Sequence, residues 1–267
     1  EYLNSLGRGA TFKEISKEIV ANIKINIPLI ERQLDIAEQF EKINMIVQLY
    51  RQELKKLDEL IKARFIEMFG DPVRNTMNWP CKPLNDVCDS IGDGLHGTPE
   101  YDDNGDYPFI NGNNLINGSI VVTPATKKVT EETYRKHLIG ISSNAILISI
   151  NGTLGKLAFY NGEQVMLGKS ACYCNLKKNI NKVFVYGVMI SRAFAEFLEN
   201  NSTKSTIKNV GLKAIREYKL ILPPTELQQQ FAAFVEQTDK SKVAIQKALD
   251  KAQLLFDSLM QKYFGQN

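Results

Sequence analysis

The chain has 267 residues, of which 43% are hydrophobic and 24% charged, and this is the composition of an ordinary soluble globular protein. No apolar run approaches the roughly 18 residues that span a membrane, and no signal peptide is visible, so we expect a cytoplasmic protein whose four cysteines are reduced. The net charge of +3 is too small to indicate nucleic-acid binding by itself. Because the chain opens on Glu1 rather than Met, we expect a fragment of something longer.

An internal repeat organises the chain, because residues 1–71 align without a gap onto residues 196–266 at a fixed offset of 196 − 1 = 195. Identical pairs recur along the alignment and include Leu3/Leu198, Lys24/Lys219, Pro28/Pro223, Glu31/Glu226, Gln33/Gln228, Leu54/Leu249 and Phe69/Phe264. Each copy has a short apolar strand, residues 23–27 or 218–222, that ends at proline, which cannot donate to a strand ladder. The acidic residue and the glutamine that follow suit the first turn of a helix.

A long helix is predicted next in each copy, because apolar residues recur in steps of three and four, the heptad spacing of a coiled coil. The seam of the first copy consists of Ile36, Phe40, Ile43, Val47, Tyr50, Leu54, Leu57, Ile61, Phe65 and Met68. The seam of the second copy consists of Phe231, Val235, Thr238, Lys242, Ile245, Leu249, Ala252, Phe256, Met260 and Tyr263. Thr238 and Lys242 weaken the second seam near its start, and Gly70 and Gly265 are placed as C-terminal caps.

A seam this narrow buries only one face of a helix, so each helix needs a partner. We expect the two helices to pair with each other as a coiled coil. The topology of the chain permits a parallel or an antiparallel pair, and the alternative is that each helix lies across its own globular domain. A helix from about residue 30 to residue 69 would be roughly 60 Å long.

Between the two helices, residues 73–222 are typical of one α+β domain with an irregular antiparallel or mixed sheet. Turn signals recur as Asn-Gly pairs at residues 111–112, 117–118, 151–152 and 161–162. The segments that resemble strands are residues 107–110, 119–122, 145–150, 156–160 and 171–176. Helices are expected at residues 183–198 and 211–217.

Charge is unevenly distributed along this domain. Residues 73–126 hold two basic and seven acidic side chains (2 − 7 = −5), whereas residues 127–222 hold fifteen basic and six acidic ones (15 − 6 = +9). A basic half is what a phosphate-binding surface needs. A solvated lysine-rich surface would have the same net charge, so charge alone leaves both interpretations open.

Several loops of the domain are rich in Asn, Gly, Thr, Ser and Lys. Asn and Lys pair with base edges, while Ser, Thr and backbone amides suit phosphates; ordinary turn chemistry is the alternative for any single loop. In the loop of residues 204–209, two lysines flank hydroxyls beside a helix start, which favours binding. The candidate DNA-binding residues are Asp93, His96, Thr98, Asn111, Asn113, Asn114, Asn151, Thr153, Lys156, Lys169, Ser170, Lys204, Ser205, Thr206, Lys208 and Asn209.

Motifs for catalysis, cofactors and metals are missing from the sequence. The Gly-Lys-Ser at residues 168–170 resembles the end of a phosphate-binding loop, but position 163, where that loop needs glycine, is Glu163. Only two histidines exist, so no Ser/His/Asp constellation is evident, and there is no glycine-rich loop for S-adenosylmethionine. The cysteine spacing does not suit structural zinc. We therefore predict no catalytic residue, no metal and no cofactor.

Taken along the chain, the motifs resemble the specificity subunit of type I restriction–modification systems. The residues that carry the resemblance are Trp79, residues 84–87 (LNDV), 92–94 (GDG), 107–114 (YPFINGNN), 146–149 (ILIS) and 220–228 (LILPPTELQ), with the echo INIPLIERQ at 25–33. Family members alternate target-recognition domains with long helices that form an antiparallel coiled coil. The resemblance implies the tail of a first recognition domain at 1–27, helices at 28–72 and 223–267, and a recognition domain at 73–222.

The function that the resemblance implies is a non-catalytic, sequence-specific DNA-binding subunit that reads one half of a bipartite target. The implied partners are double-stranded DNA, the DNA-methyltransferase (modification) subunits and, through the complex, the restriction and motor subunits, with no membrane. The complete complex would cleave DNA and methylate adenine. A coiled-coil scaffold whose central domain binds protein is the alternative, and an enzyme in its own right is a third interpretation.

Overall fold

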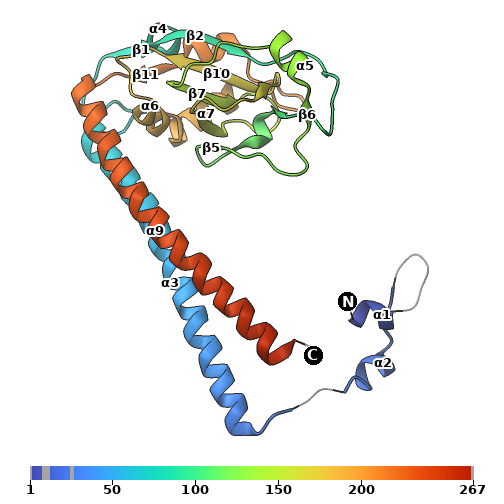
Figure 1. Cartoon of the computed structure of the whole chain (residues 1–267). Helices are drawn as coiled ribbons and strands as arrows, with labels where there is room; N and C mark the ends of the chain where they lie inside the picture. The colour runs from blue at the N-terminus through green and yellow to red at the C-terminus, as the bar shows by residue number, and fades with distance from the viewer. Residues whose placement is uncertain (1, 8–12, 25–26, 266–267) are drawn as a thin grey trace. The chain divides into compact units, whose positions relative to one another are not determined.

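The computed structural model describes residues 2–7, 13–24 and 27–265 (Figure 1). The chain divides into two compact units, Glu53–Ile245 and Glu1–Gln52 together with Gln246–Asn267. Each long helix contributes residues to both units. None of the described helices is both long and apolar enough to cross a membrane.

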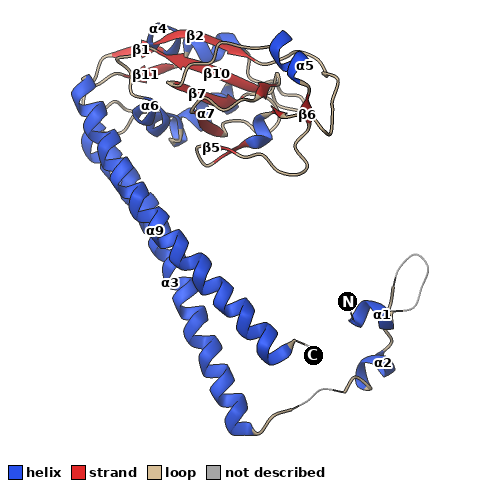
Figure 2. Cartoon of the chain, viewed as in Figure 1, coloured by secondary structure: helices blue, strands red, loops and turns tan. Residues whose placement is uncertain are grey.

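The first unit, Glu53–Ile245, is built on a four-stranded antiparallel sheet (Figure 2). In spatial order its strands are β2 (Cys88–Asp93), β10 (Ala171–Leu176), β7 (Ala145–Ser149) and β8 (Leu157–Tyr160). All five residues of β7 are buried, which fits a central strand with both faces covered. β10 has the bounds that the sequence predicts, and β7 and β8 are each one residue shorter.

Smaller sheets surround this one and include a parallel strand pair, so the fold is α+β with a mixed sheet, as predicted. β3 (Tyr107–Ile110) lies between β6 (Lys128–Val129), which is antiparallel to it, and β9 (Met166–Leu167), which is parallel. The short hairpin of β4 (Leu115–Ile116) and β5 (Ser119–Ile120) turns at Asn117 and Gly118, whose φ angles are +49° and +84°. Positive φ at both turn residues is what a tight hairpin requires. β1 (Cys81–Pro83) pairs with β11 (Lys219–Ile221).

Short helices cover and connect the strands. They are α4 (Leu84–Val87), the 3₁₀ turn η1 (Gly112–Asn114), α5 (Glu131–Lys136), α6 (Lys182–Met189), α7 (Arg192–Asn200) and α8 (Leu212–Glu217). The single helix expected at residues 183–198 is therefore wrong, because the chain breaks between α6 and α7. Ser191 causes the break by capping α7, since its hydroxyl accepts a hydrogen bond from the Phe194 amide at 3.4 Å.

The two long helices are α3 (Ile30–Phe69) and α9 (Thr225–Phe264), and they pack antiparallel in each unit. In the smaller unit, Arg32 contacts Tyr263 and Phe40 stacks edge-on against Phe256, so low numbers in α3 meet high numbers in α9. In the larger unit, contacts run in the same sense: Lys242 pairs with Asp58, Phe234 lies against Arg64, and Phe231 lies against Phe65 and Phe69.

The predicted seam of α3 is confirmed, because all ten of its residues are buried or half-buried. In α9 the one correction is Met260, which is exposed, while Leu259 beside it is half-buried. Gly70 ends α3 with a φ of +73°, as a left-handed cap does, but Gly265 ends α9 without a positive φ. The chain that leaves α3 through Gly70 turns back into the domain.

Two short helices, α1 (Tyr2–Leu6) and α2 (Lys17–Ala21), lie at the N-terminal end. The strand expected at residues 23–27 falls partly on residues 25–26, which lie outside the described residues. Residues 23, 24 and 27 are in no strand. In the second copy the strand β11 is paired with β1.

The main core of the larger unit joins the sheet to the helices that pack on it. Four phenylalanines from three helices form its centre, with ring centroids 4.9–6.0 Å apart where they touch: Phe65, Phe69, Phe184 and Phe231. Gly187 of α6 allows this packing, since a Cβ there would lie 2.7 Å from the ring of Phe65. The ends of α3 and α9 in this unit are thus part of the same core as the sheet.

Candidate nucleic-acid interface

The loops predicted to bind DNA meet at one end of the strands, although the sequence separates them by more than a hundred residues. Register places Asp93, the last residue of β2, opposite Cys172 near the start of β10, and Ala171 opposite Ser149, the last residue of β7. The parallel strands β3 and β9 end at the same edge, where the Gly112 amide donates to the Ser170 hydroxyl at 3.0 Å. We call this end of the domain the loop edge.

A cleft of about 430 Å³ opens at the loop edge. Five of the predicted residues line it: Asp93, His96, Asn151, Lys169 and Asn209. Its remaining wall comes from residues that the sequence did not single out, Ile150 and residues 210–212, where α8 begins. The cleft therefore brings together an acid, an imidazole, a lysine and two carboxamides.

The turn after β2 is fixed against β9. The Leu95 amide donates to the Leu167 carbonyl at 2.7 Å, and the Lys169 amide donates to the Leu95 carbonyl at 3.0 Å. Gly94 makes this close approach possible, because a Cβ there would lie 2.1 Å from the Leu167 oxygen. The exposed His96 ring bonds to the Asp93 carboxylate at 2.7 Å, which satisfies part of the hydrogen-bonding capacity of both groups.

On the other side of the cleft, the loop of residues 203–209 is bridged to the loop after β7. Asn151 and Asn209 form an isolated antiparallel bridge, and the Asn151 carboxamide donates to the Asn209 carboxamide at 3.4 Å. The Ser205 hydroxyl is turned into its own loop, where it donates to the Ile207 carbonyl at 2.6 Å. Thr206 lies exposed at the tip of the loop.

The lysines at the loop edge differ in whether an acidic side chain of the domain pairs with their charge. Lys208 pairs with Glu199, so its charge is partly compensated within the domain. Lys169 and Lys204 are exposed and make no ion pair with any residue the structure describes. They are the cations of this edge that are available to a phosphate.

Three of the predicted residues are used to hold the loops together. Asn111 caps η1, and its side-chain oxygen accepts from the Ser170 hydroxyl at 2.9 Å. Asn114 completes the capping box by accepting from the Asn111 amide at 2.9 Å, and it donates to the Val121 carbonyl. Asn113, between them, is exposed, and its side chain makes no hydrogen bond among the described residues. Thr98 and Thr153 are also exposed.

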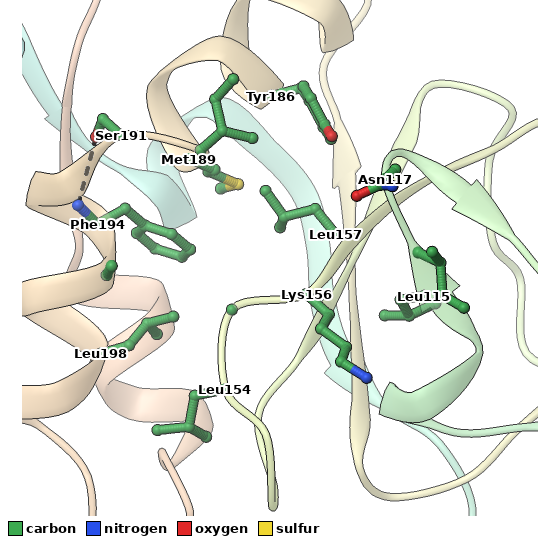
Figure 3. Close-up of a pocket in the computed structure, with 14 residues that line it drawn as sticks. Leu115, Asn117, Leu154, Lys156, Leu157, Tyr186, Met189, Ser191, Phe194 and Leu198 are labelled. Atoms are coloured by element: carbon green, nitrogen blue, oxygen red, sulfur yellow. Dashed lines mark hydrogen bonds between the residues drawn. The ribbon is translucent and has the colours of Figure 1, made fainter. Parts of the chain in front are cut away.

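Lys156 lies apart from the cleft, at a second and mostly apolar pocket of about 500 Å³. Figure 3 shows its side chain extending toward the segment of Leu115, with Leu154, Phe194 and Leu198 around the same hollow. Its backbone amide donates to the Ser149 hydroxyl at 2.8 Å, which closes the loop after β7. Its position does not place it with Lys169 and Lys204.

One positioning residue was missed by the sequence argument. The Arg216 guanidinium of α8 donates to the Ile91 carbonyl at 2.9 Å and so ties α8 to β2, the strand that ends at Asp93. No pattern in the sequence distinguishes Arg216 from the exposed basic residues around it. Burial raises the pKa of the nearby Tyr173 hydroxyl, with Cys172 and Asp93 acting in the same direction, so this phenol stays neutral at physiological pH.

The structure groups no set of three or more histidine, cysteine or carboxylate side chains in a metal-binding arrangement among the residues it describes. Cys88, Cys172 and Cys174 are buried in the core as free thiols, and Cys81 is exposed. Hydrogen bonding to Cys172 and to Cys88, together with burial, raises the pKa of Cys174 well above its usual value. The Cys174 thiol is therefore a protonated core residue.

Comparison with known proteins adds two findings. Residues 77–254 match a protein family described as the type I restriction modification DNA specificity domain. A type I restriction–modification S subunit from M. genitalium has a similar fold, with 15% identity, a TM-score of 0.60, and coverage of 98% of this chain and 69% of that chain. For the HsdS subunit from Thermoanaerobacter tengcongensis, the identity is 17%, the TM-score 0.54 and the coverage 99% and 67%.

A third solved chain, from work on complex assembly and conformational transition of the type I R-M system, is similar over 95% of this chain and 64% of its own length. Its identity is 19% and its TM-score 0.59. The chain thus spans about two thirds of the length of each of these solved chains. At these identities the likeness is one of fold.

Proposed function

Because the chain belongs to the family of type I restriction–modification DNA specificity domains, we propose that residues 73–222 read one half of a bipartite DNA target through the loop edge. A specificity domain selects the sequence and does not itself perform the chemistry. The observation that carries the proposal is the convergence of four loops on one cleft lined by Asp93, His96, Asn151, Lys169 and Asn209. These side chains supply the donors and acceptors with which base edges are recognised.

Phosphate contacts come from the rim of the same edge. Lys169 and Lys204 are exposed and carry charges that no described acidic group compensates, so they hold the domain against the DNA backbone. Contacts of this kind position a protein on duplex DNA without selecting a sequence, while groups inside the cleft select the bases. Asn113 and Thr153, exposed on neighbouring loops, extend the surface that faces the DNA.

The long helices α3 and α9 dock the DNA-methyltransferase subunits, and through them the restriction and motor subunits. Exposed apolar side chains on the helices support this assignment, because isolated helices would leave them in water: Leu34, Met45, Leu49, Leu254 and Leu255. In the complete complex the methyltransferase subunits supply adenine methylation. Residues 1–27 form the tail of another recognition domain. The helices that follow the two domains comprise residues 28–72 and 223–267. The comparisons give no support to a protein-binding scaffold.

The experiment that tests this function is titration of the chain with duplex DNA over a range of salt concentrations. Replacing both Lys169 and Lys204 with alanine should weaken binding to all sequences and flatten the salt dependence by roughly two units of log–log slope. The matched control is the pair Lys177→Ala and Lys178→Ala, because both exposed lysines directly follow β10, at the end of the sheet opposite the loop edge. Equal effects of the two double variants would contradict the loop edge as the DNA-binding surface.

A further inference from the structure

Two asparagines at the loop edge have their carboxamides joined and their remaining hydrogen-bonding groups unused. Asn151 Nδ2 donates to Asn209 Oδ1 at 3.4 Å. Among the described residues, Asn151 Oδ1 and Asn209 Nδ2 have no partner, and both side chains line the 430 Å³ cleft. The pair therefore offers one acceptor and one donor side by side.

The backbone holds this pair in place. On one side of the bridge between Asn151 and Asn209, the Gly152 amide donates to the Lys208 carbonyl at 2.9 Å, and on the other the Val210 amide donates to the Ile150 carbonyl at 2.9 Å. The Asn209 amide itself donates to the Thr203 hydroxyl at 3.1 Å. Because both backbones are fixed, the two carboxamides are positioned before any ligand arrives, which is what specific recognition requires.

An acceptor beside a donor matches one base only. In the major groove, adenine presents a donor at N6 and an acceptor at N7, while guanine presents two acceptors, cytosine a donor and thymine an acceptor with a methyl group. We propose that Asn151 and Asn209 act together to recognise the adenine of one A·T pair, with N6 donating to Asn151 Oδ1 and Asn209 Nδ2 donating to N7. This inference rests on the proposed function. It adds the identity of one recognised base, adenine, and the two side-chain atoms that contact it.

The other polar groups of the cleft do not compete for this role. His96 and Asp93 already bond to each other, and Lys169 has donors but no acceptor, so it cannot satisfy the N6 amino group. Asn111 and Asn114 resemble the pair in sequence, but their carboxamides are used in capping η1. Asn151 and Asn209 are thus the two described carboxamides that both line the cleft and keep complementary groups free.

The test begins with the full chain assembled with its methyltransferase subunits and a library of randomised duplex DNA. Selection gives the preferred sequence, and each A·T pair in it is then replaced by the other three pairs. Wild-type protein should show one A·T pair at which Asn151→Ala and Asn209→Ala each lower discrimination by about 10- to 100-fold. The preference of both variants at the other positions should be unchanged. The control variant Asn104→Ala, which alters an exposed turn residue before β3, should keep the wild-type preference at every position.

Base analogues separate the two contacts without relying on the folding of a variant. At that position, 7-deazaadenine lacks the N7 acceptor and purine lacks the N6 amino group, and each should weaken wild-type binding by roughly 3- to 10-fold. In Asn209→Ala, 7-deazaadenine should no longer weaken binding, whereas purine still should. In Asn151→Ala, purine should no longer weaken binding, whereas 7-deazaadenine still should.

The outcomes distinguish this inference from the function on which it rests. A wild-type complex with no sequence preference would contradict the proposed function and the adenine contact together. A clear preference with no A·T pair sensitive to either analogue would contradict the adenine contact alone. Uniform weakening on all sequences in both asparagine variants would also overturn it, because the pair would then be positioning the loops and not selecting a base.

Discussion

The two copies of the repeated segment place nearly the same local structure in different surroundings. With the offset of 195, α8 begins at Leu212 and α2 at Lys17, which are aligned positions (212 − 195 = 17). Ile215 of α8 is 0% exposed, whereas its counterpart Val20 in α2 is 54% exposed. Leu198 is 1% exposed and Leu3, its counterpart, 53%. The local sequence is thus sufficient to form the helix in both copies, while the burial of its apolar side chains depends on the domain against which it packs.

The hydrogen bonds at the start of the two long helices also include a local bond that both copies share and a tertiary bond that one copy has. Gln33 Nε2 donates to the Pro28 carbonyl at 2.8 Å, and Gln228 Nε2 donates to the Pro223 carbonyl at 2.8 Å. This bond reaches back five residues and is common to both copies. Among the residues that the structure describes, only Gln228 of this pair has a second, long-range partner, because its Oε1 accepts from the Asn181 amide at 3.0 Å. A sequence repeat therefore reproduces the local bond and not the tertiary one.

The largest effect expected from this comparison is at the buried helix position. Ile215→Ala should lower the free energy of unfolding by about 2–5 kcal/mol, because it opens a cavity in the main core. Val20→Ala should change it by less than about 0.5 kcal/mol, since the side chain is exposed. Urea unfolding of both variants measures the difference, and a similar loss in both would contradict it.

A longer chain sharpens this prediction. If residues 1–27 are the tail of another recognition domain, a chain that carries that domain should bury Val20. Val20→Ala should then cost about 0.5–1.5 kcal/mol, the usual cost of removing small groups from a core. An unchanged stability in the longer chain would count against the proposed domain division, without affecting the account of residues 73–222.

A smaller effect is expected at the two glutamines. Gln228→Ala should cost about 1–3 kcal/mol, because it leaves the Asn181 amide without its partner in a part-buried place. Gln33→Ala removes only the local bond and should cost about 0.5 kcal/mol. Denaturant midpoints of the two variants give the comparison directly. Equal costs would show that the long-range bond contributes nothing to stability.

The smallest effect concerns the seam position at which the copies differ in chemistry. Val47 is buried in the first copy, and its counterpart is Lys242 (242 − 195 = 47), whose ammonium lies 2.6 Å from Asp58 and 3.2 Å from Asp239. Burial lowers the pKa of Lys242, but hydrogen bonds to the two carboxylates outweigh it, and the pKa is raised above its usual value. A raised pKa means that the stabilisation is present at neutral pH and is lost only as pH rises through that value.

Lys242→Ala should therefore cost no more than about 1 kcal/mol at neutral pH, because both carboxylates remain largely exposed. Lys242→Val, which copies Val47, should restore stability to within about 1 kcal/mol of wild type and reduce its salt dependence. Unfolding measured at low and at high salt checks both statements. A loss that is large and independent of salt in Lys242→Val would mean that the ion pair fixes the register of the helices.

Local patterns in the sequence predict much of the fold, but they cannot predict features that depend on contacts between distant segments. Heptad spacing predicts the seam of α3 in full, and Asn-Gly turns locate the ends of β3, β7 and β8, because these signals act over a few residues. The order of strands and the parallel pair of β3 and β9 have no local signal, since pairing joins distant segments. Ser191 could have indicated the break between α6 and α7, but the apolar period on both sides masked it.

The same limit applies to the candidate site. Asn111, Asn113 and Asn114 are alike in sequence, yet two of them turn inward as caps and one stays exposed. Which side chain turns inward depends on Ser170 and Val121, partners that are brought in by other strands. The sequence therefore predicts the composition of the loops, and the fold decides which carboxamides remain free to meet DNA.

The central claim, that the loop edge binds DNA, is tested most directly by hydrogen–deuterium exchange of the full chain with and without its selected duplex. The account predicts slower exchange in peptides that cover residues 93–98, 151–156, 168–170 and 203–209, at the end of the sheet that holds the cleft. Peptides at the opposite end, covering residues 140–144 and 177–181, should be unchanged. Protection confined to that opposite end, or to the long helices, would contradict the account.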